Sequence, residues 1–267
     1  MTGFGGEGPH RGQRPRIEYP GGTVTDDPNI ALLFAPHRSL RAIVEAVVEA
    51  RQGRAECDGS AARLDLGCYH VFGGDSASPG ARRLVQSALR PRELVYGNDP
   101  AWRQLILEVH GPSVFDRPME EFDPSGLEEA ALAAHQTSVP PSLALRRLDA
   151  SLAAQLDGEL EPHGLQVFPS ANALAEQGLG FGVVQGERLA SAATSYTRSS
   201  RYVEVAIATR EAFRGQGLAM SAAAALLREC LRLGLEPCWS ASNPVSKRLA
   251  LRLGYLPGRT CEVLYLR

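Results

Sequence analysis

The chain has 267 residues, 44% of them hydrophobic, with a formal net charge of −2 at pH 7. This length suits one large domain or two small ones, and the balanced charge gives no reason to expect binding to nucleic acid or a membrane surface. No apolar run reaches the roughly 18 residues of a membrane-spanning helix, and the N-terminus shows no apolar signal core.

Hydrophobic periodicity and turn residues divide the first half into elements. Residues 1–27 are rich in Gly, Pro and Arg and are expected to be a disordered tail. A strand is expected at 29–34 and an amphipathic helix at 39–52. The other elements expected here are strands at 62–66 and 68–72, helices at 82–89, 100–110 and 127–134, and an irregular stretch at 112–124.

The second half alternates short helices and strands in the same way. A hairpin is expected at 180–196 around Gln185-Gly186-Glu187, followed by an apolar strand at 203–209. A long helix is expected from Leu218 to about residue 233. The remaining expected elements are helices at 150–156, 172–177 and after Asn243, and strands at 237–242 and 263–266. We therefore expect an N-terminal α/β domain at 28–136 and a second domain at 137–267.

Cysteines and histidines show no spacing that indicates a metal site. The five cysteines are odd in number and widely spread, without a C-x-x-C pair. This argues against a disulfide scaffold or a zinc site, and it favours a reducing, cytoplasmic location. The six histidines also lack metal-ligand spacing, so we expect no metal.

The most informative segment is the turn between the 203–209 strand and the long helix. Its residues are Arg214, Gly215, Gln216, Gly217, Leu218 and Ala219. Glycines let the backbone approach a phosphate, and the first amides of a helix have no internal partners. Arg214 adds a fixed positive charge, so the segment predicts a cradle for a pyrophosphate.

Two other nucleotide-binding turns lack a required residue here, and one alternative stays open. A Walker loop would need a Gly-Lys-Ser/Thr ending, which is absent. A dinucleotide fingerprint would need a third glycine where Met220 stands. The turn is also compatible with an ordinary strand-to-helix connection in which the glycines only relieve crowding.

A second segment favours one family. The strand at 237–242 leads into Asn243, a good N-cap, then Pro244 at the first helical position and a closing Gly254. R-x-x-G-x-A followed by N-x-x-S-x-x-L-A-x-x-x-G-Y resembles the two signatures of the GNAT superfamily of N-acetyltransferases. The resemblance implies an α/β (α+β) GNAT fold: a mixed, mostly antiparallel sheet flanked by helices, in which the two signature strands run parallel and splay apart.

The segment from Glu204 to Tyr255 also resembles a bacterial subgroup that includes zwittermicin-resistance-type acetyltransferases. Shared positions are Glu204, Thr209, Cys230, Leu231, Pro237, Trp239, Ala241, Asn243, Ser246, Leu249, Gly254 and Tyr255. One position departs, because the subgroup usually has Asp where this chain has Ser240. If that carboxylate serves the substrate, its loss suggests a different acceptor.

The resemblance implies acetyl-CoA, or another acyl-CoA, as co-substrate. The backbone of Ile207, Ala208 and Thr209 would bind the pantetheine arm. The amides from Arg214 to Ala219 would bind the pyrophosphate, and Asn243 would also bond the pantetheine.

The chemistry also needs a proton acceptor, because a free alkyl amine is mostly protonated at pH 7. Glu204 is our candidate base, and the alternative is a strand-edge carboxylate paired with an arginine such as Arg201. In many relatives a tyrosine protonates the departing thiolate, but that position is Ala250 here. Ser246 or water would then take its place, or the thiolate would leave unprotonated.

We therefore expect an acetyl-CoA-dependent N-acetyltransferase that acts on a primary amine of a small molecule, such as an antibiotic or a natural-product intermediate. Two alternatives stay open: a non-catalytic CoA-binding or sensor module, and a protein or peptide N-acetyltransferase. The N-terminal domain carries no chemical motif, so it either walls the acceptor site or is a degenerate second copy of the fold. A homodimer is an open option.

Overall fold

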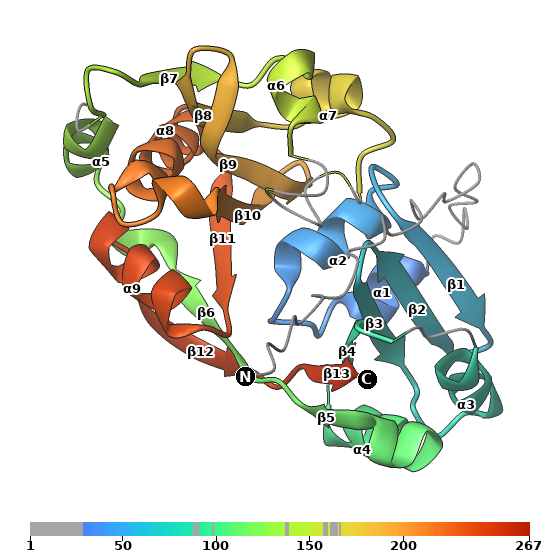
Figure 1. The fold of residues 1–267 in the computed structure, drawn as a ribbon. Coiled ribbons are helices and arrows are strands. Elements are labelled where there is room, and N and C mark those ends of the chain that lie inside the picture. Colours follow the sequence, from blue (N-terminus) through green and yellow to red (C-terminus); the bar gives the residue numbers. More distant parts are fainter. Residues whose placement is uncertain are drawn as a thin grey trace, which may run out of the picture.

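The computed structural model describes residues 29–87, 91–97, 99–136, 139–156, 160, 165 and 167–267. The expected tail at 1–27 lies outside the described residues, as do residues 137 and 138 at the expected domain boundary. Figure 1 shows two sheets, each flanked by helices.

The first sheet has six strands in the order β1-β2-β3-β4-β13-β5. Its strands are β1 (Arg54–Asp58), β2 (Ala61–Leu66), β3 (Tyr69–Gly74), β4 (Leu94–Gly97), β5 (Val114–Asp116) and β13 (Leu264–Leu266). The helices that accompany it are α1 (Ile30–Phe34), α2 (Arg41–Val48), α3 (Pro79–Gln86) and α4 (Pro100–His110). Trp102 of α4 packs on Phe72 of β3 on the face that α3 and α4 cover.

The second sheet has seven strands in the order β12-β6-β11-β10-β9-β8-β7. Its strands are β6 (Met119–Asp123), β7 (Ala144–Arg147), β8 (Gly180–Gln185), β9 (Arg188–Arg198), β10 (Tyr202–Thr209), β11 (Glu236–Ala241) and β12 (Leu256–Cys261). Its helices are α5 (Glu129–Gln136), α6 (Ala150–Ala154), α7 (Ala171–Gln177), α8 (Leu218–Arg232) and α9 (Pro244–Leu253). Three short 3₁₀ turns complete the described elements: Gly111–Ser113, Pro124–Gly126 and Glu211–Phe213.

The two sheets share one connectivity. In each, three antiparallel strands lead through a helix to a parallel fourth strand: β1-β2-β3, α3 and β4 in the first, and β8-β9-β10, α8 and β11 in the second. Each sheet then receives one strand from the other half. The C-terminal β13 lies between β4 and β5, and β6 lies between β11 and β12. The domain boundary at residue 137 stays a prediction. Strands β6 and β13 each belong to the sheet on the other side of that boundary.

Helix α2 lies between the two sheets. Its buried residues Ile43, Val44 and Val47 belong to a core that includes Leu64 and Leu66 of β2 and also side chains of the second half. The other face of the second sheet packs on α8, where Leu218, Leu226, Leu227 and the alanines at 222–225 are almost fully buried. The expected packing of this long helix on a sheet is therefore confirmed.

Two sequence-based expectations are wrong in the first half. Residues 30–34 form helix α1 instead of a strand. The prediction failed because the spacing of only five apolar residues cannot distinguish a helix from a strand. The stretch at 112–124, expected to be irregular, contains β5 and β6. Strand β6 carries three acidic residues among five, so its sequence pattern is weak, and pairing with both β11 and β12 stabilises it.

Candidate active site

The parallel strands β10 and β11 diverge at Glu204. Their ladder covers three positions, from Tyr202 and Glu236 to Glu204 and Cys238, after which β11 pairs with β6 instead. A β-bulge in the β9 pairing occurs at the same point, between Glu204 and Val205. The parallel and splayed arrangement that the family resemblance implied is therefore confirmed, and it leaves one edge of β10 without a neighbouring strand beyond the bulge.

A smaller cavity of about 290 Å³ lies where the strands diverge. The second half contributes the strand segment 204–207, with Ser240, Ser242 and Ser246. The first sheet and the segments beside it supply the opposite wall, together with Met119 of β6: Cys68, Tyr69, Arg92, Leu94, Arg117 and Tyr265. The N-terminal half thus walls this cavity.

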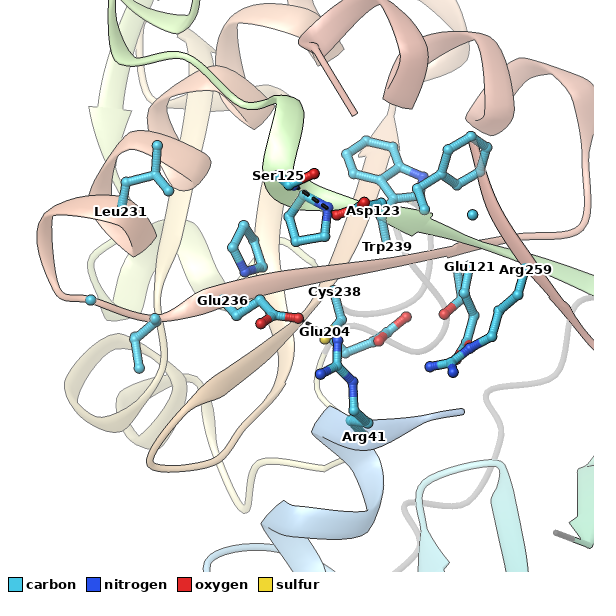
Figure 2. Close-up of a pocket in the computed structure, with 17 residues that line it drawn as sticks. Arg41, Glu121, Asp123, Ser125, Glu204, Leu231, Glu236, Cys238, Trp239 and Arg259 are labelled. Atoms are coloured by element: carbon cyan, nitrogen blue, oxygen red, sulfur yellow. Dashed lines mark hydrogen bonds and ion pairs between the residues drawn. The ribbon is translucent and has the colours of Figure 1, made fainter. Parts of the chain in front are cut away.

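A larger cavity of about 740 Å³ meets the smaller one at Glu204, which lines both. Its charged lining residues are four carboxyl groups and two arginines: Glu121, Asp123, Glu204, Glu236, Arg41 and Arg259. Figure 2 shows Arg41 reaching from α2 toward Glu236, with which it forms an ion pair. Arg259 pairs with Glu121 at 2.9 Å. Acidic groups are therefore in excess in this cavity.

Glu204 is a buried carboxyl group with an unpartnered oxygen. Its side chain is 5% exposed, and its Oε2 has no hydrogen-bond partner among the described residues. Burial raises the pKa of Glu204 to about 8, with a further increase from Glu121 that hydrogen bonding from Ser240 opposes. Arg201 pairs instead with Glu45, so the alternative of a Glu204–Arg201 pair is wrong.

The glycine turn before α8 presents backbone N–H groups that have no hydrogen-bond acceptor among the described residues. Within the described part of the chain, the amides of residues 215–219 donate no hydrogen bond, and Gly217 as N-cap offers α8 no capping side chain. Gly215 and Gly217 both have φ of +78°, and a Cβ at either would meet no neighbouring atom within 4 Å. The glycines therefore serve backbone conformation and not the relief of crowding.

Arg214 contributes through its side chain and not its amide. The amide of Arg214 already donates to the carbonyl oxygen of Glu211 at 3.1 Å, which corrects the expectation that the amides from residue 214 onward are all free. The guanidinium is exposed, and its Nε lies 3.4 Å from the Thr209 carbonyl oxygen. The free amides therefore begin at Gly215.

The second signature forms a capped helix beside the smaller cavity. Asn243 accepts a hydrogen bond from the Ser246 amide at 2.9 Å, so its predicted N-cap role is confirmed. This bond occupies Oδ1, which leaves Nδ2 for the pantetheine contact that stays a prediction. The Ser246 hydroxyl accepts a hydrogen bond from Trp239 Nε1 at 3.1 Å. Ser246 and Glu204 thus line one cavity, as a shared role requires.

Three cysteines of the described chain lack the environment of a nucleophile. Burial raises the pKa of Cys68 to about 11 and that of Cys230 to about 12, and it raises the pKa of Cys238 well above its usual range. The described residues contain no cluster of His, Cys, Asp and Glu that suits a metal. Among the described helices, none combines the length and the apolar character needed to cross a bilayer.

Sequence reasoning missed the charged residues that the first half brings to the site. Arg92, Arg117 and Glu121 line the cavities, although each lies more than 80 residues before Glu204. No motif surrounds them, so only the topology reveals their place. Tyr255, the aromatic residue of the second signature, lies in the core and donates to the Pro237 carbonyl oxygen at 3.0 Å.

The fold and the open cradle define a class: GNAT-fold acyltransferases. The GNAT acetyltransferase family profile matches residues 33–264, which is most of the chain. The chain belongs to that family of transferases.

Similar proteins agree with this assignment. An uncharacterised N-acetyltransferase of Bacillus subtilis, YdfB, is 29% identical over 119 residues, which are 44% of this chain and 46% of that relative. The chain thus spans about half of that relative's length. A GCN5-related N-acetyltransferase-like protein from Streptococcus suis superposes with a TM-score of 0.79 at 24% identity, covering 90% of this chain and 97% of that one. One from Kribbella flavida has a TM-score of 0.58 at 16% identity, covering 86% and 96%. These two structures support the fold.

Proposed function

We propose that the protein transfers an acetyl group directly from acetyl-CoA to a primary amine of a small molecule. The observation that carries the proposal is the buried Glu204 carboxyl at the point where two parallel strands diverge, with one oxygen that has no hydrogen-bond partner among the described residues. It combines a perturbed pKa, a cavity and an adjacent anion cradle, which together are typical of a functional site.

The residues of the chain fit this donor. The five free amides of residues 215–219, at the positive end of a 15-residue helix, suit a diphosphate. The unpaired edge of β10 at Ile207, Ala208 and Thr209 suits the amide groups of the pantetheine arm. A backbone N–H on this edge would polarise the thioester carbonyl. Acetyl-CoA supplies the activated acyl group when bound.

Glu204 would accept the proton that the amine must lose. With a pKa of about 8, the carboxyl is mostly protonated at pH 7 in the free protein, and only the carboxylate accepts a proton. Activity should therefore rise as the pH passes through about 8. A bound ammonium group would stabilise the carboxylate and make the base form more abundant.

The tyrosine that protonates the departing thiolate in many relatives is replaced by Ala250 in this chain. Ser246 lines the same cavity as Glu204, so its hydroxyl or a water molecule is the proposed proton donor. Tyr255 does not take this role, since its hydroxyl is bonded within the core.

The subgroup resemblance extends the proposal to amines of antibiotics or natural products. The free cysteines support a reducing, cytoplasmic location for the proposed reaction. We also propose that the N-terminal half is a degenerate copy of the same fold, because the two sheets share one connectivity.

The test is the Glu204→Gln variant, which keeps the shape of the side chain but cannot accept the proton. We expect kcat to fall by about 10²-fold or more while CoA affinity holds. The measurements are thiol release against a panel of amines and titration calorimetry with CoA, with Glu187→Gln on the exposed β8–β9 turn as control. An unchanged kcat would assign Glu204 a structural role.

The same assays separate the alternatives. CoA binding without turnover on any amine or peptide would indicate a sensor module. Turnover on peptides alone would indicate a protein-modifying enzyme. A protein that binds neither CoA nor acetyl-CoA would overturn the proposal as a whole.

A further inference from the structure

Two arginines of the N-terminal half line the smaller cavity opposite the signature strand. Arg92 lies two residues before Leu94, the first residue of β4, and Arg117 directly follows β5. Both line the cavity that contains Glu204 and Ser246. They come from segments 25 positions apart in the sequence, so their shared place depends on the exchanged strand β13 between β4 and β5.

The two arginines line one cavity together with Tyr265 of β13. Tyr265 of β13 is paired with Leu94 of β4 and with Phe115 of β5. Arg92 lies two positions before Leu94, and Arg117 lies two positions after Phe115. Arg92 lies in a turn before β4 with a φ of 72°, so its place beside Tyr265 follows from the cavity that both residues line. The place of Arg117 follows from its contact with the Tyr265 ring.

Neither guanidinium has an acidic partner among the described residues. The Arg117 guanidinium lies over the Tyr265 ring, 4.9 Å from its centroid, and this contact leaves its N–H donors free. Other arginines of this half are paired, as Arg54 and Arg63 with Asp65, and Arg103 with Asp116. Two unpaired guanidinium groups in one cavity suit an anionic group, since their forked donors match carboxylate and phosphate oxygens.

We propose that the acceptor carries an anionic group, held by Arg92 and Arg117, and presents its amine to Glu204. This inference rests on the proposed acetyl transfer. The acceptors would be small amino acids or aminophosphonates, in which one molecule holds an amine and an anion a few bonds apart. Glu204 and the arginines then contact opposite ends of one acceptor.

The donor's own phosphates are the competing anion. They are assigned to the cradle at residues 215–219, beyond the far end of β10 from Glu204, whereas the arginines line the cavity beside residues 204–207. The cavity wall from the N-terminal half therefore faces the reacting end of the donor, where the acceptor must lie.

The experiment measures thiol release by the full chain with three matched sets of amines: α-amino acids, their carboxamides, and the corresponding aminoalkylphosphonates. We expect kcat/KM for the acids or the phosphonates to exceed that for the uncharged carboxamides by at least about 10-fold, the scale of one lost charge-assisted hydrogen bond. The better anionic set identifies which anion the site prefers.

The variants Arg92→Gln and Arg117→Gln should each raise KM for the anionic acceptor by about 10-fold, move the acid-to-amide ratio toward one, and leave KM for acetyl-CoA unchanged. The matched control is Arg82→Gln, an exposed arginine of α3 that pairs with Glu108 and lines neither cavity.

Other results would overturn the inference. Equal rates for acids and carboxamides, unaffected by the variants, would refute an anion site while the acetyl transfer stands. A raised KM for acetyl-CoA would assign the arginines to the donor phosphates. Acetylation of none of these sets, with CoA still bound, would also refute the substrate class, whereas loss of CoA binding in the unmodified protein would refute the proposed function itself.

Discussion

The two halves of the molecule have the same strand connectivity, but the loops that lead into α3 and α8 differ in whether their backbone amides are already hydrogen-bonded. In the second half, the five consecutive amides of residues 215–219, in the turn from β10 to α8, donate to no described residue. In the corresponding turn from β3 to α3, Asp75 accepts from the Ala77 amide, Ser78 caps the Ala81 amide, and Pro79 has no amide N–H. The first turn also carries a carboxylate where a phosphate would lie. The free amides of the second turn are therefore a property of its loop and not of the topology that the two halves share.

Buried charge differs between the halves as well. In the first half, Asp65 contacts His70 at 2.6 Å, Arg63 and Arg54 at 2.8 Å, and His70 Nε2 lies 2.9 Å from Glu93. In the second half, Glu204 has an unpartnered oxygen. Several buried charges of the first half contact one another, whereas the second half keeps a buried carboxyl in an unfavourable state, which is typical of a catalytic group.

The largest expected effect is on the stability of the first half. Asp65→Asn should lower the free energy of unfolding by about 3–5 kcal/mol, because it leaves buried positive groups without their partner. Chemical denaturation measures this loss, and CoA affinity of the folded variant should stay unchanged. A loss under about 1 kcal/mol would show that the network is not the stabilising feature of this half.

The pH dependence of that network has a defined sign. Burial opposes both charges, but His70 and the arginines lower the pKa of Asp65 to about 2, and the carboxylates raise the pKa of His70. The Asp65 contribution is lost as the pH falls from about 4 toward 2, and the His70 contribution is lost as the pH rises above its usual 6.5. Stability from this network should therefore be greatest between about pH 4 and 6.5.

Glu204→Gln should stabilise the protein at alkaline pH. Because burial raises the pKa of Glu204 to about 8, ionisation makes the folded state less favourable as the pH rises from about 4.5 to above 8. The variant removes this cost, so its gain should be at most about 5 kcal/mol near pH 9 and close to zero near pH 4. Thermal unfolding at both pH values measures it, and a destabilised variant at pH 9 would contradict the assigned burial effect.

Gly217→Asp should place a carboxylate in the turn before α8, as Asp75 does in the turn before α3. A carboxylate in the cradle would repel the diphosphate, and we expect CoA affinity to fall by about 30- to 100-fold. Gly217→Asn is the matched control, since Asn tolerates the same φ without the charge, and it should lose only a few-fold. Arg214→Ala should weaken binding by about 10-fold. Titration calorimetry that finds equal losses for Asp and Asn would refute the electrostatic account.

The smallest expected effect is a shift in the pH profile. Glu121 raises the pKa of Glu204, and hydrogen bonding from Ser240 lowers it. Glu121→Gln should therefore move the midpoint of kcat/KM to lower pH by a fraction of a unit, and Ser240→Ala should move it to higher pH. Profiles that move in the same direction for both variants would show that Glu204 is not the titrating group.

The sequence predicted the second half well because its elements are local. The glycine turn, the Asn243 cap and the closing Gly254 each act on the residues beside them, and all three form as predicted. The first half was predicted less well. Strand β6, with its acidic sequence, forms only because β11 and β12 lie on either side of it.

The sequence by itself indicated the family, the proposed donor turn and the candidate base, since these depend on residue types at fixed short spacings. Tertiary structure decided which residues of the first half lie opposite the candidate base. The exchange of β6 and β13 brings Glu121, Arg92 and Arg117 to Glu204, and burial there raises the pKa of the carboxyl. Strand pairing and desolvation act between residues far apart in the chain, so no local pattern encodes them.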